Sequence, residues 1–68
     1  MDFRAFNEED QPDTIDLNEV YLIEYINRRM YFHTLDKKYF LGSTIKSMAS
    51  LMADLGFVQV NSSILINV

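Results

Sequence analysis

The chain has 68 residues and no cysteine, so it forms at most one small domain, and neither a disulfide nor a thiolate zinc site can reinforce it. Its hydrophobic content of 49% indicates a folded domain, and its single histidine cannot build an imidazole metal cage. No apolar run approaches the roughly 20 residues of a membrane span, and the acidic N-terminus has the wrong sign for a signal peptide. We therefore expect a soluble, cytoplasmic protein that needs no cofactor.

The net charge of −4 is unevenly distributed along the chain. Residues 1–19 carry seven acidic side chains and one basic one, whereas residues 20–68 carry three acidic and five basic ones. An acidic leader thus precedes a mildly basic body. The body remains a candidate for binding nucleic acid, because the local field rather than the total charge steers a polyanion.

Residues 1–13 show no sustained hydrophobic period and contain the only proline. We expect an acidic flexible leader over 1–13. A single β-rich domain is expected over 14–68.

The segment that follows predicts a meander of three strands. Runs rich in aromatic and β-branched residues cover 20–26, 29–34 and 38–41. Asn27-Arg28 and Asp36 have turn chemistry and separate these runs, and Gly42 ends the third strand.

After Gly42 the hydrophobic period changes from that of a strand to that of a helix. Five apolar residues share one helical face: Ile45, Met48, Leu51, Met52 and Leu55. Ser43 or Thr44 supplies the N-cap, and Gly56 occupies the position of a left-handed C′ residue. Two short strands, 57–60 and 64–68, then flank the turn 61–63. The predicted fold class is mostly β with one short helix, an α+β domain.

Five segments together carry a family resemblance in one register over roughly residues 15–67. They are DLNEVYLIE at 16–24, NRR at 27–29, FHTLDKKY at 32–39, STIKSM at 43–48 and FVQVNSSILIN at 57–67. In this order they resemble the LytTR family of bacterial DNA-binding domains, the output domains of response regulators. The resemblance implies small β-sheets and duplex DNA read by loops in successive major grooves rather than by a recognition helix. The chain departs from the family pattern in having Asn-Ser-Ser at 61–63 and in ending one residue after Asn67.

The resemblance places DNA contacts on two loops. Asn27, Arg28 and Arg29 form the first loop, where an arginine can bind guanine O6 and N7 together, although a solvated hairpin tip would look the same. Asn61 and Ser62 belong to the second loop and can donate to bases or phosphates, although plain turn chemistry explains them equally well. For Ser63, plain turn chemistry is the preferred interpretation.

Three lysines are candidates for positioning contacts to phosphates: Lys37, Lys38 and Lys46. Lys46 lies in the first helical turn, where the helix dipole disfavours a cation and a bound partner would offset the cost. Ordinary surface lysine is the alternative for each. The acidic leader is either a solvating tail or a phosphate mimic that folds over the Arg28/Arg29 loop.

The remaining polar residues indicate structure rather than catalysis. We expect His33 to be a half-buried histidine with a local hydrogen-bond partner, and Glu24 to face solvent or to pair across the sheet with Arg28, Arg29 or a lysine. No glycine-rich phosphate loop, metal-ligand spacing or catalytic dyad is present, so we do not expect an enzyme.

An alternative function is protein binding. The apolar terminal strand, with Ile64, Leu65, Ile66 and Val68, needs cover and predicts strand addition with another chain. The partner would be a second copy, giving a homodimer, or a full-length LytTR-type regulator that this chain would antagonise.

Overall fold

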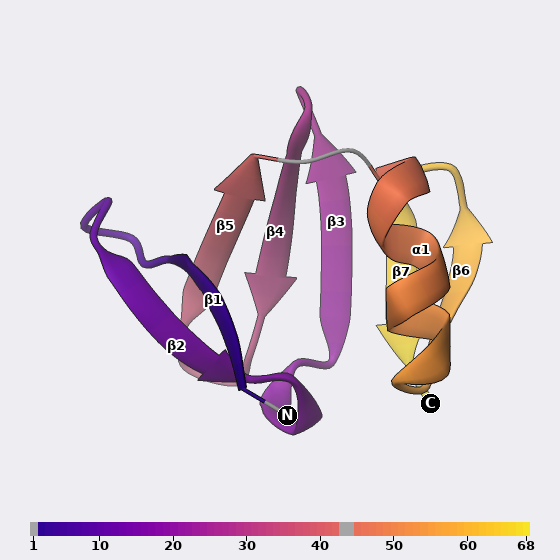
Figure 1. The fold of residues 1–68 in the computed structure, drawn as a ribbon, viewed down its shortest axis with the longest axis horizontal. Helices are drawn as coiled ribbons and strands as arrows, with labels where there is room; N and C mark the ends of the chain where they lie inside the picture. Colours follow the sequence, from indigo (N-terminus) through magenta and orange to yellow (C-terminus); the bar gives the residue numbers. More distant parts are fainter. Residues whose placement is uncertain (1, 43–44) are drawn as a thin grey trace.

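The computed structural model describes residues 2–42 and 45–68. Within these residues it is mostly β with one α-helix, which confirms the predicted fold class (Figure 1). In chain order the elements are β1 (Asp2–Phe6), β2 (Pro12–Asp16), the 3-10 helix η1 (Leu17–Glu19), β3 (Leu22–Ile26), β4 (Arg29–His33), β5 (Lys38–Gly42), α1 (Ile45–Asp54), β6 (Phe57–Asn61) and β7 (Ile64–Asn67).

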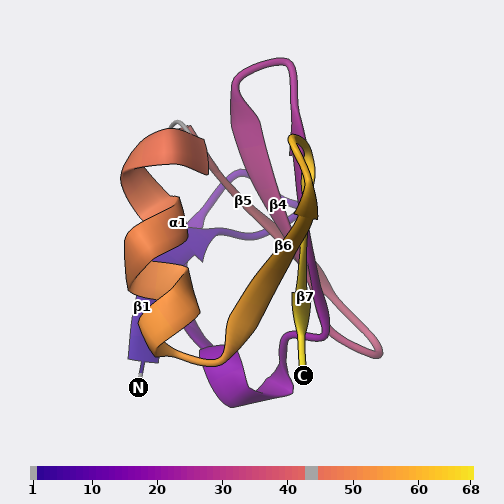
Figure 2. The same cartoon turned by 90° about the vertical axis from the view of Figure 1, so that its right-hand side faces the viewer.

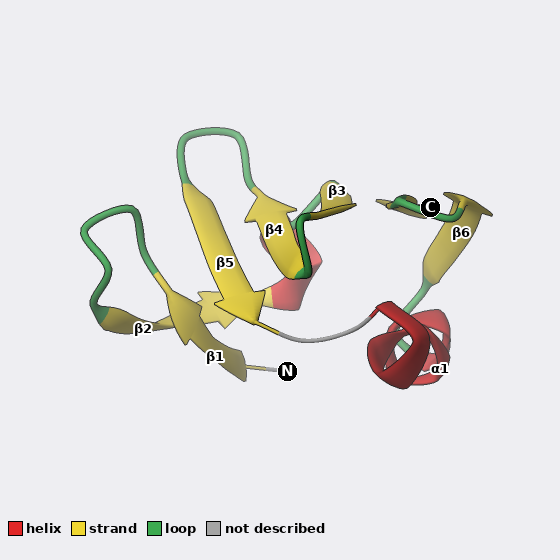
Figure 3. Ribbon diagram, turned by 90° about the horizontal axis from the view of Figure 1, so that it is seen from above, coloured by secondary structure: helices red, strands yellow, loops and turns green. Residues whose placement is uncertain are grey.

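The strands form one antiparallel sheet in the order β2-β1-β5-β4-β3-β7-β6. The predicted meander is confirmed as its centre, with β4 paired to β3 on one side and to β5 on the other. β1 meets β5 at the pair Phe6 and Phe40, and Figure 3 shows the β1–β2 hairpin turned away from the meander. The β1–β2 hairpin is therefore joined to the meander by a single residue pair. The expected small sheets form one bent sheet.

The structure corrects the expectation of a flexible leader over 1–13. β1 pairs with β2 along its whole length, from Asp2 with Asp16 to Phe6 with Pro12. Ala5 is only 4% exposed, and the Phe3 ring lies 5.6 Å from that of Phe32 between centroids. Sequence reasoning missed this hairpin because β2 is mostly polar and its pairing depends on contacts with distant residues.

The core lies between α1 and one face of the sheet, as the side view in Figure 2 shows. Ile23, Met30, Phe32 and Leu65 from the sheet and Met52 from α1 are almost completely buried. Period-2 alternation along β3 and β4 produces this packed face. The predicted core role of Met52 is confirmed. The side chains of Ile45 and Met48 lie outside the described residues.

The end of α1 follows the predicted pattern. Gly56 has a φ of +96°, and its N–H donates to the carbonyl of Ala53 at 3.1 Å. A left-handed glycine after the last turn satisfies helix carbonyls that would otherwise lack partners. The predicted N-cap residues, Ser43 and Thr44, lie outside the described residues.

β7 corrects the prediction that the terminal strand is an open edge. It pairs with β3 through Leu22 and Ile66, and with β6 through Val58 and Ile66, so its backbone is paired on both sides. Leu65 is 1% exposed and belongs to the core. This chain itself pairs the backbone of β7 on both sides and buries Leu65, whereas the side chain of Ile66 is 36% exposed. Val68 lies beyond the strand and is exposed.

Candidate nucleic-acid interface

The turn between β3 and β4 has an unusual backbone conformation. It consists of Asn27 with φ +50° and Arg28 with φ +65°, flanked by the pair Ile26 and Arg29. Two left-handed residues in a two-residue hairpin are typical of a type I′ turn, which favours glycine at the second position. An L-residue there costs about 1–2 kcal/mol relative to glycine. The hairpin tip therefore has a strained backbone, and its arginine, Arg28, is exposed.

Arg29 lies beneath the tip, on the face of the sheet opposite α1. Its guanidinium carbon is 4.7 Å from the centroid of the Phe40 ring, a cation–π contact. Phe40 in turn stacks on Phe6 and lies near Tyr31, with centroid distances of 5.6 Å and 6.4 Å. The two arginines thus differ in setting. Arg28 extends from the turn, whereas Arg29 is held against an aromatic row.

The turn between β6 and β7 is fixed by two hydrogen bonds. The Oδ1 atom of Asn61 accepts from the N–H of Ser63 at 2.8 Å, and the carbonyl of Ser63 accepts from the N–H of Tyr25 at 2.7 Å. These bonds confirm turn chemistry for Ser63 and tie the loop to β3. Asn61 and Ser62 are exposed.

The two turns lie at the same end of the sheet, at the top of Figure 1, because β3 and β7 are adjacent and antiparallel. We call residues 27–29 and 61–63 the reading end. Two strand spacings, about 10 Å, separate the hairpin centres across the sheet, and the β3–β4 tip extends about two residues farther along the strands than the β6–β7 turn, where Ser63 bonds to Tyr25. The charged residues of the reading end are two arginines and no acid. Lys46 belongs to the first turn of α1, which begins at this end, but its side chain lies outside the described residues.

Lys37 and Lys38 are not brought to the reading end. Lys37 closes the β4–β5 turn, in which the N–H of Thr34 donates to the Lys37 carbonyl at 2.9 Å, and Lys38 is the first residue of β5. Successive turns of a meander lie at opposite ends, so the length of β4, about 14 Å, separates the two ends. The ammonium group of Lys38 lies 5.6 Å from the centroid of the Tyr31 ring.

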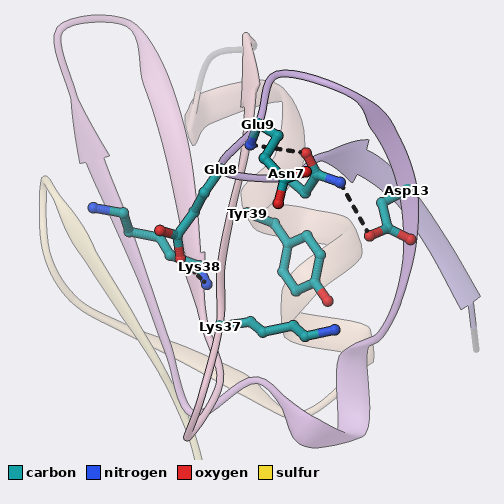
Figure 4. A pocket seen from close by; sticks show the side chains of 7 residues that line it. All are labelled: Asn7, Glu8, Glu9, Asp13, Lys37, Lys38 and Tyr39. Atoms are coloured by element: carbon teal, nitrogen blue, oxygen red, sulfur yellow. Dashed lines mark hydrogen bonds between the residues drawn. The ribbon is translucent and has the colours of Figure 1, made fainter.

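The acidic loop between β1 and β2 lies next to these lysines, in the pocket shown in Figure 4. The Oε1 atom of Glu8 accepts from the backbone N–H of Lys38 at 3.2 Å. Asn7 orders the loop, since its Oδ1 accepts from the N–H groups of Glu9 and Gln11 at 3.0 Å and 3.1 Å. The idea that the leader folds over the Arg28/Arg29 loop is therefore wrong for this structure.

His33 and Glu24 form a pair on the open face of the sheet. The Nε2 atom of His33 lies 2.6 Å from Oε1 of Glu24, and both side chains are half-buried. The local partner predicted for His33 is confirmed. Glu24 pairs across the sheet, which was one of its two predicted settings, but with this histidine rather than with an arginine or a lysine. The strand register explains this pairing. His33 lies opposite Leu22, and Leu22 is two residues before Glu24 on the same face of the sheet. Arg29 instead contacts the ring of Phe40. Within 2–42 and 45–68, no group of three potential ligands is arranged to hold a metal ion.

Asn67 is a residue whose role sequence reasoning did not identify. Its Nδ2 donates to the carbonyl of Val20 at 2.9 Å, and its N–H donates to the carbonyl of Tyr21 at 3.1 Å. These bonds attach the end of β7 to the start of β3, which places the two turns side by side. The signal available in the sequence was a single amide side chain within an apolar strand.

The fold and its reading end can now be compared with known proteins. The family comparison matches the LytTR DNA-binding domain over residues 13–68. The chain belongs to the LytTR family. Neither the search of curated proteins nor that of solved structures gave a match. The matched family is one of DNA-binding domains. No helix in the described part of this LytTR domain is long and apolar enough to cross a membrane.

Proposed function

We propose that this LytTR domain recognises a specific duplex DNA sequence through its reading end, as part of a bacterial transcription regulator in the cytoplasm. The observation that carries the proposal is the convergence of two hairpin turns at one end, one of them with a strained, exposed Arg28. Backbone strain is concentrated at functional sites in proteins, where the surrounding structure stabilises it.

The spacing of the turns supports insertion into a single groove. A major groove is about 12 Å wide, which accommodates two turns whose centres lie about 10 Å apart across the sheet. Successive major grooves lie about 34 Å apart along the duplex, beyond the largest extent of this chain, 28 Å. Two loops in successive grooves, which the family resemblance implied, would therefore require a longer molecule than these residues form.

Within that groove the residues have different roles. Arg28 at the tip binds a guanine through two hydrogen bonds, and Asn61 and Ser62 approach base edges or phosphates from the second turn. Arg29, held against Phe40, and Lys46 contact phosphates and set the register without reading sequence.

The charge distribution orients the domain toward DNA. The acidic β1–β2 loop lies beside Lys37 and Lys38, at a distance from the reading end, where the arginines have no acidic neighbour in their own turns. A duplex therefore attracts the arginine-bearing end and repels the acidic side. The net charge of −4 taken alone would instead predict that DNA repels the domain.

The test is selection from a random-sequence duplex pool at low and near-physiological salt. Enrichment of one motif, lost in Arg28→Ala and kept in the matched control Lys37→Ala, supports the proposal. Binding that disappears with salt and enriches no sequence would reduce the interaction to nonspecific electrostatics and would contradict it.

A further inference from the structure

The face of the sheet opposite the core carries aromatic side chains from three neighbouring strands. Tyr31 lies between the buried residues Met30 and Phe32 of β4, so its side chain points away from the core. Tyr31 pairs with Phe40 of β5, and Phe40 pairs with Phe6 of β1. Phe6 is 37% exposed, and the other two rings are half-buried. In Figure 3 α1 lies on the other side of the meander, and no described element covers these three rings.

Two cations lie on the rings, one toward each end of β4. The guanidinium carbon of Arg29 is 4.7 Å from the centroid of Phe40, and the ammonium group of Lys38 is 5.6 Å from that of Tyr31. Arg29 begins β4 and Lys38 pairs with its last residue, so about 14 Å of strand separates them. The carboxylate on this face of the meander, that of Glu24, already lies 2.6 Å from a ring nitrogen of His33. The rings are therefore framed by positive charge.

A shallow hollow opens beside Tyr31. Its volume is about 190 Å³, and it is lined by Glu24, Ile26, Tyr31, His33 and Lys38. One wall is an aromatic ring, another is an aliphatic side chain, and a cation lies at the rim. A flat apolar group carrying a negative charge nearby matches this surface, because the ring and the isoleucine bury the flat group while the lysine binds the charge.

We propose that this face binds single-stranded nucleic acid, with bases stacked on Tyr31 and Phe40 and phosphates held by Lys38 and Arg29. Unpaired bases expose their flat faces and stack on aromatic side chains, while basic groups follow the backbone. A duplex offers only base edges in its grooves, since its bases are stacked on one another, and would leave the rings without a partner. An acidic peptide would satisfy the two cations but not the rings.

The acidic loop between β1 and β2 sets the direction of the strand. Glu8 accepts a hydrogen bond from the backbone N–H of Lys38 at 3.2 Å, so a carboxylate borders the face at that corner. A polyanion bound to Lys38 is repelled there and runs over Tyr31 and Phe40 toward Arg29. The binding site thus follows β4 and β5 rather than the β1–β2 loop.

Substitutions at Tyr31 test the stacking. The assay is fluorescence anisotropy of a labelled oligothymidylate of about 12 nucleotides, at low and near-physiological salt. Tyr31→Leu keeps an apolar side chain but removes the ring, whereas Tyr31→Phe keeps the ring and is the matched control. We expect Tyr31→Phe to bind like wild type and Tyr31→Leu to bind about 5- to 150-fold more weakly. Circular dichroism confirms that both variants fold, and Phe40→Leu repeats the test at the second ring.

Two neighbouring lysines test the charge. Lys38→Gln and Lys37→Gln change the net charge equally, but only Lys38 lines the hollow beside Tyr31. We expect Lys38→Gln to weaken binding and to reduce the slope of log affinity against log salt by about 0.7, the value for one phosphate contact on a single strand. Lys37→Gln should leave both quantities near wild type. An equal loss in the two variants would mean unspecific attraction and would overturn the proposal.

The proposal stands independently of duplex recognition by the reading end. Arg28→Ala should keep the affinity for oligothymidylate, and Tyr31→Leu should keep the affinity for the selected duplex. If no duplex sequence is selected, the proposed function fails while the single-strand result is unaffected. A wild-type chain that does not bind oligothymidylate at low salt, or a Tyr31→Leu variant that binds it as tightly as Tyr31→Phe, would overturn the inference.

Discussion

Replacement of Arg28 by glycine should make the domain more stable and a weaker DNA binder at the same time. Arg28 has φ +65° in a turn that prefers glycine at its position, and the left-handed conformation costs about 1–2 kcal/mol for an L-residue. The greater entropy of glycine in the unfolded chain offsets about 0.5–1 kcal/mol of that gain. The net expectation for Arg28→Gly is a stabilisation of up to about 1.5 kcal/mol, or an increase in Tm of up to about 12 °C for a domain of this size.

The DNA effect should have the opposite sign. Loss of a bidentate contact to guanine costs about 1–3 kcal/mol, which corresponds to a roughly 5- to 150-fold weaker affinity for the selected duplex. Thermal unfolding and fluorescence anisotropy measure the two quantities. Arg28→Ala is the control, because alanine loses the guanidinium but keeps the strain, so it should weaken binding equally without raising Tm. A lower Tm for Arg28→Gly, or an unchanged affinity, would refute the reasoning.

Three other substitutions test the structural account. Asn67→Ala leaves the buried Val20 carbonyl without its side-chain donor and should cost about 1–3 kcal/mol in urea unfolding; a cost near zero would contradict the role given to Asn67. Gly56→Ala should cost about 1–2 kcal/mol in the same assay, because its φ of +96° strains any L-residue, while the nearest atom to the new Cβ, Oδ1 of Asn67, lies at 3.8 Å and leaves room. Glu8→Gln combined with Glu9→Gln should leave DNA affinity unchanged in anisotropy titrations at physiological salt, since the acidic loop lies beside Lys38 rather than Arg28; tighter binding would revive the phosphate-mimic hypothesis.

The parts of the fold that sequence predicted are those defined by local contacts. The meander β3–β4–β5 follows from three aromatic and β-branched runs joined by short turns, and α1 follows from a 3.6-residue period ended by Gly56. Pairings between distant segments were missed. The β1–β2 hairpin docks on β5 through Phe6 and Phe40, and no local pattern encodes that contact.

The two turns of the candidate site were predicted, but their convergence at one end of the sheet was not. Both turns were expected as loops, yet their convergence depends on β7 lying beside β3, a contact that Asn67 makes with Val20 across 47 residues of sequence. The exclusion of Lys37 and Lys38 could have been inferred, because alternate turns of a meander lie at opposite ends. The positive φ of Arg28 could not, since an Asn-Arg pair is compatible with several turn types.

The most direct test of the account is a map of amide chemical shifts in the ¹⁵N-labelled chain titrated with its selected duplex. We predict that perturbations concentrate at residues 27–29 and 61–63, and that those at 7–11 and 34–38 stay small. Perturbations centred on the β4–β5 turn around Lys37, with the Arg28 amide unchanged, would contradict the claim that DNA is read by the paired turns.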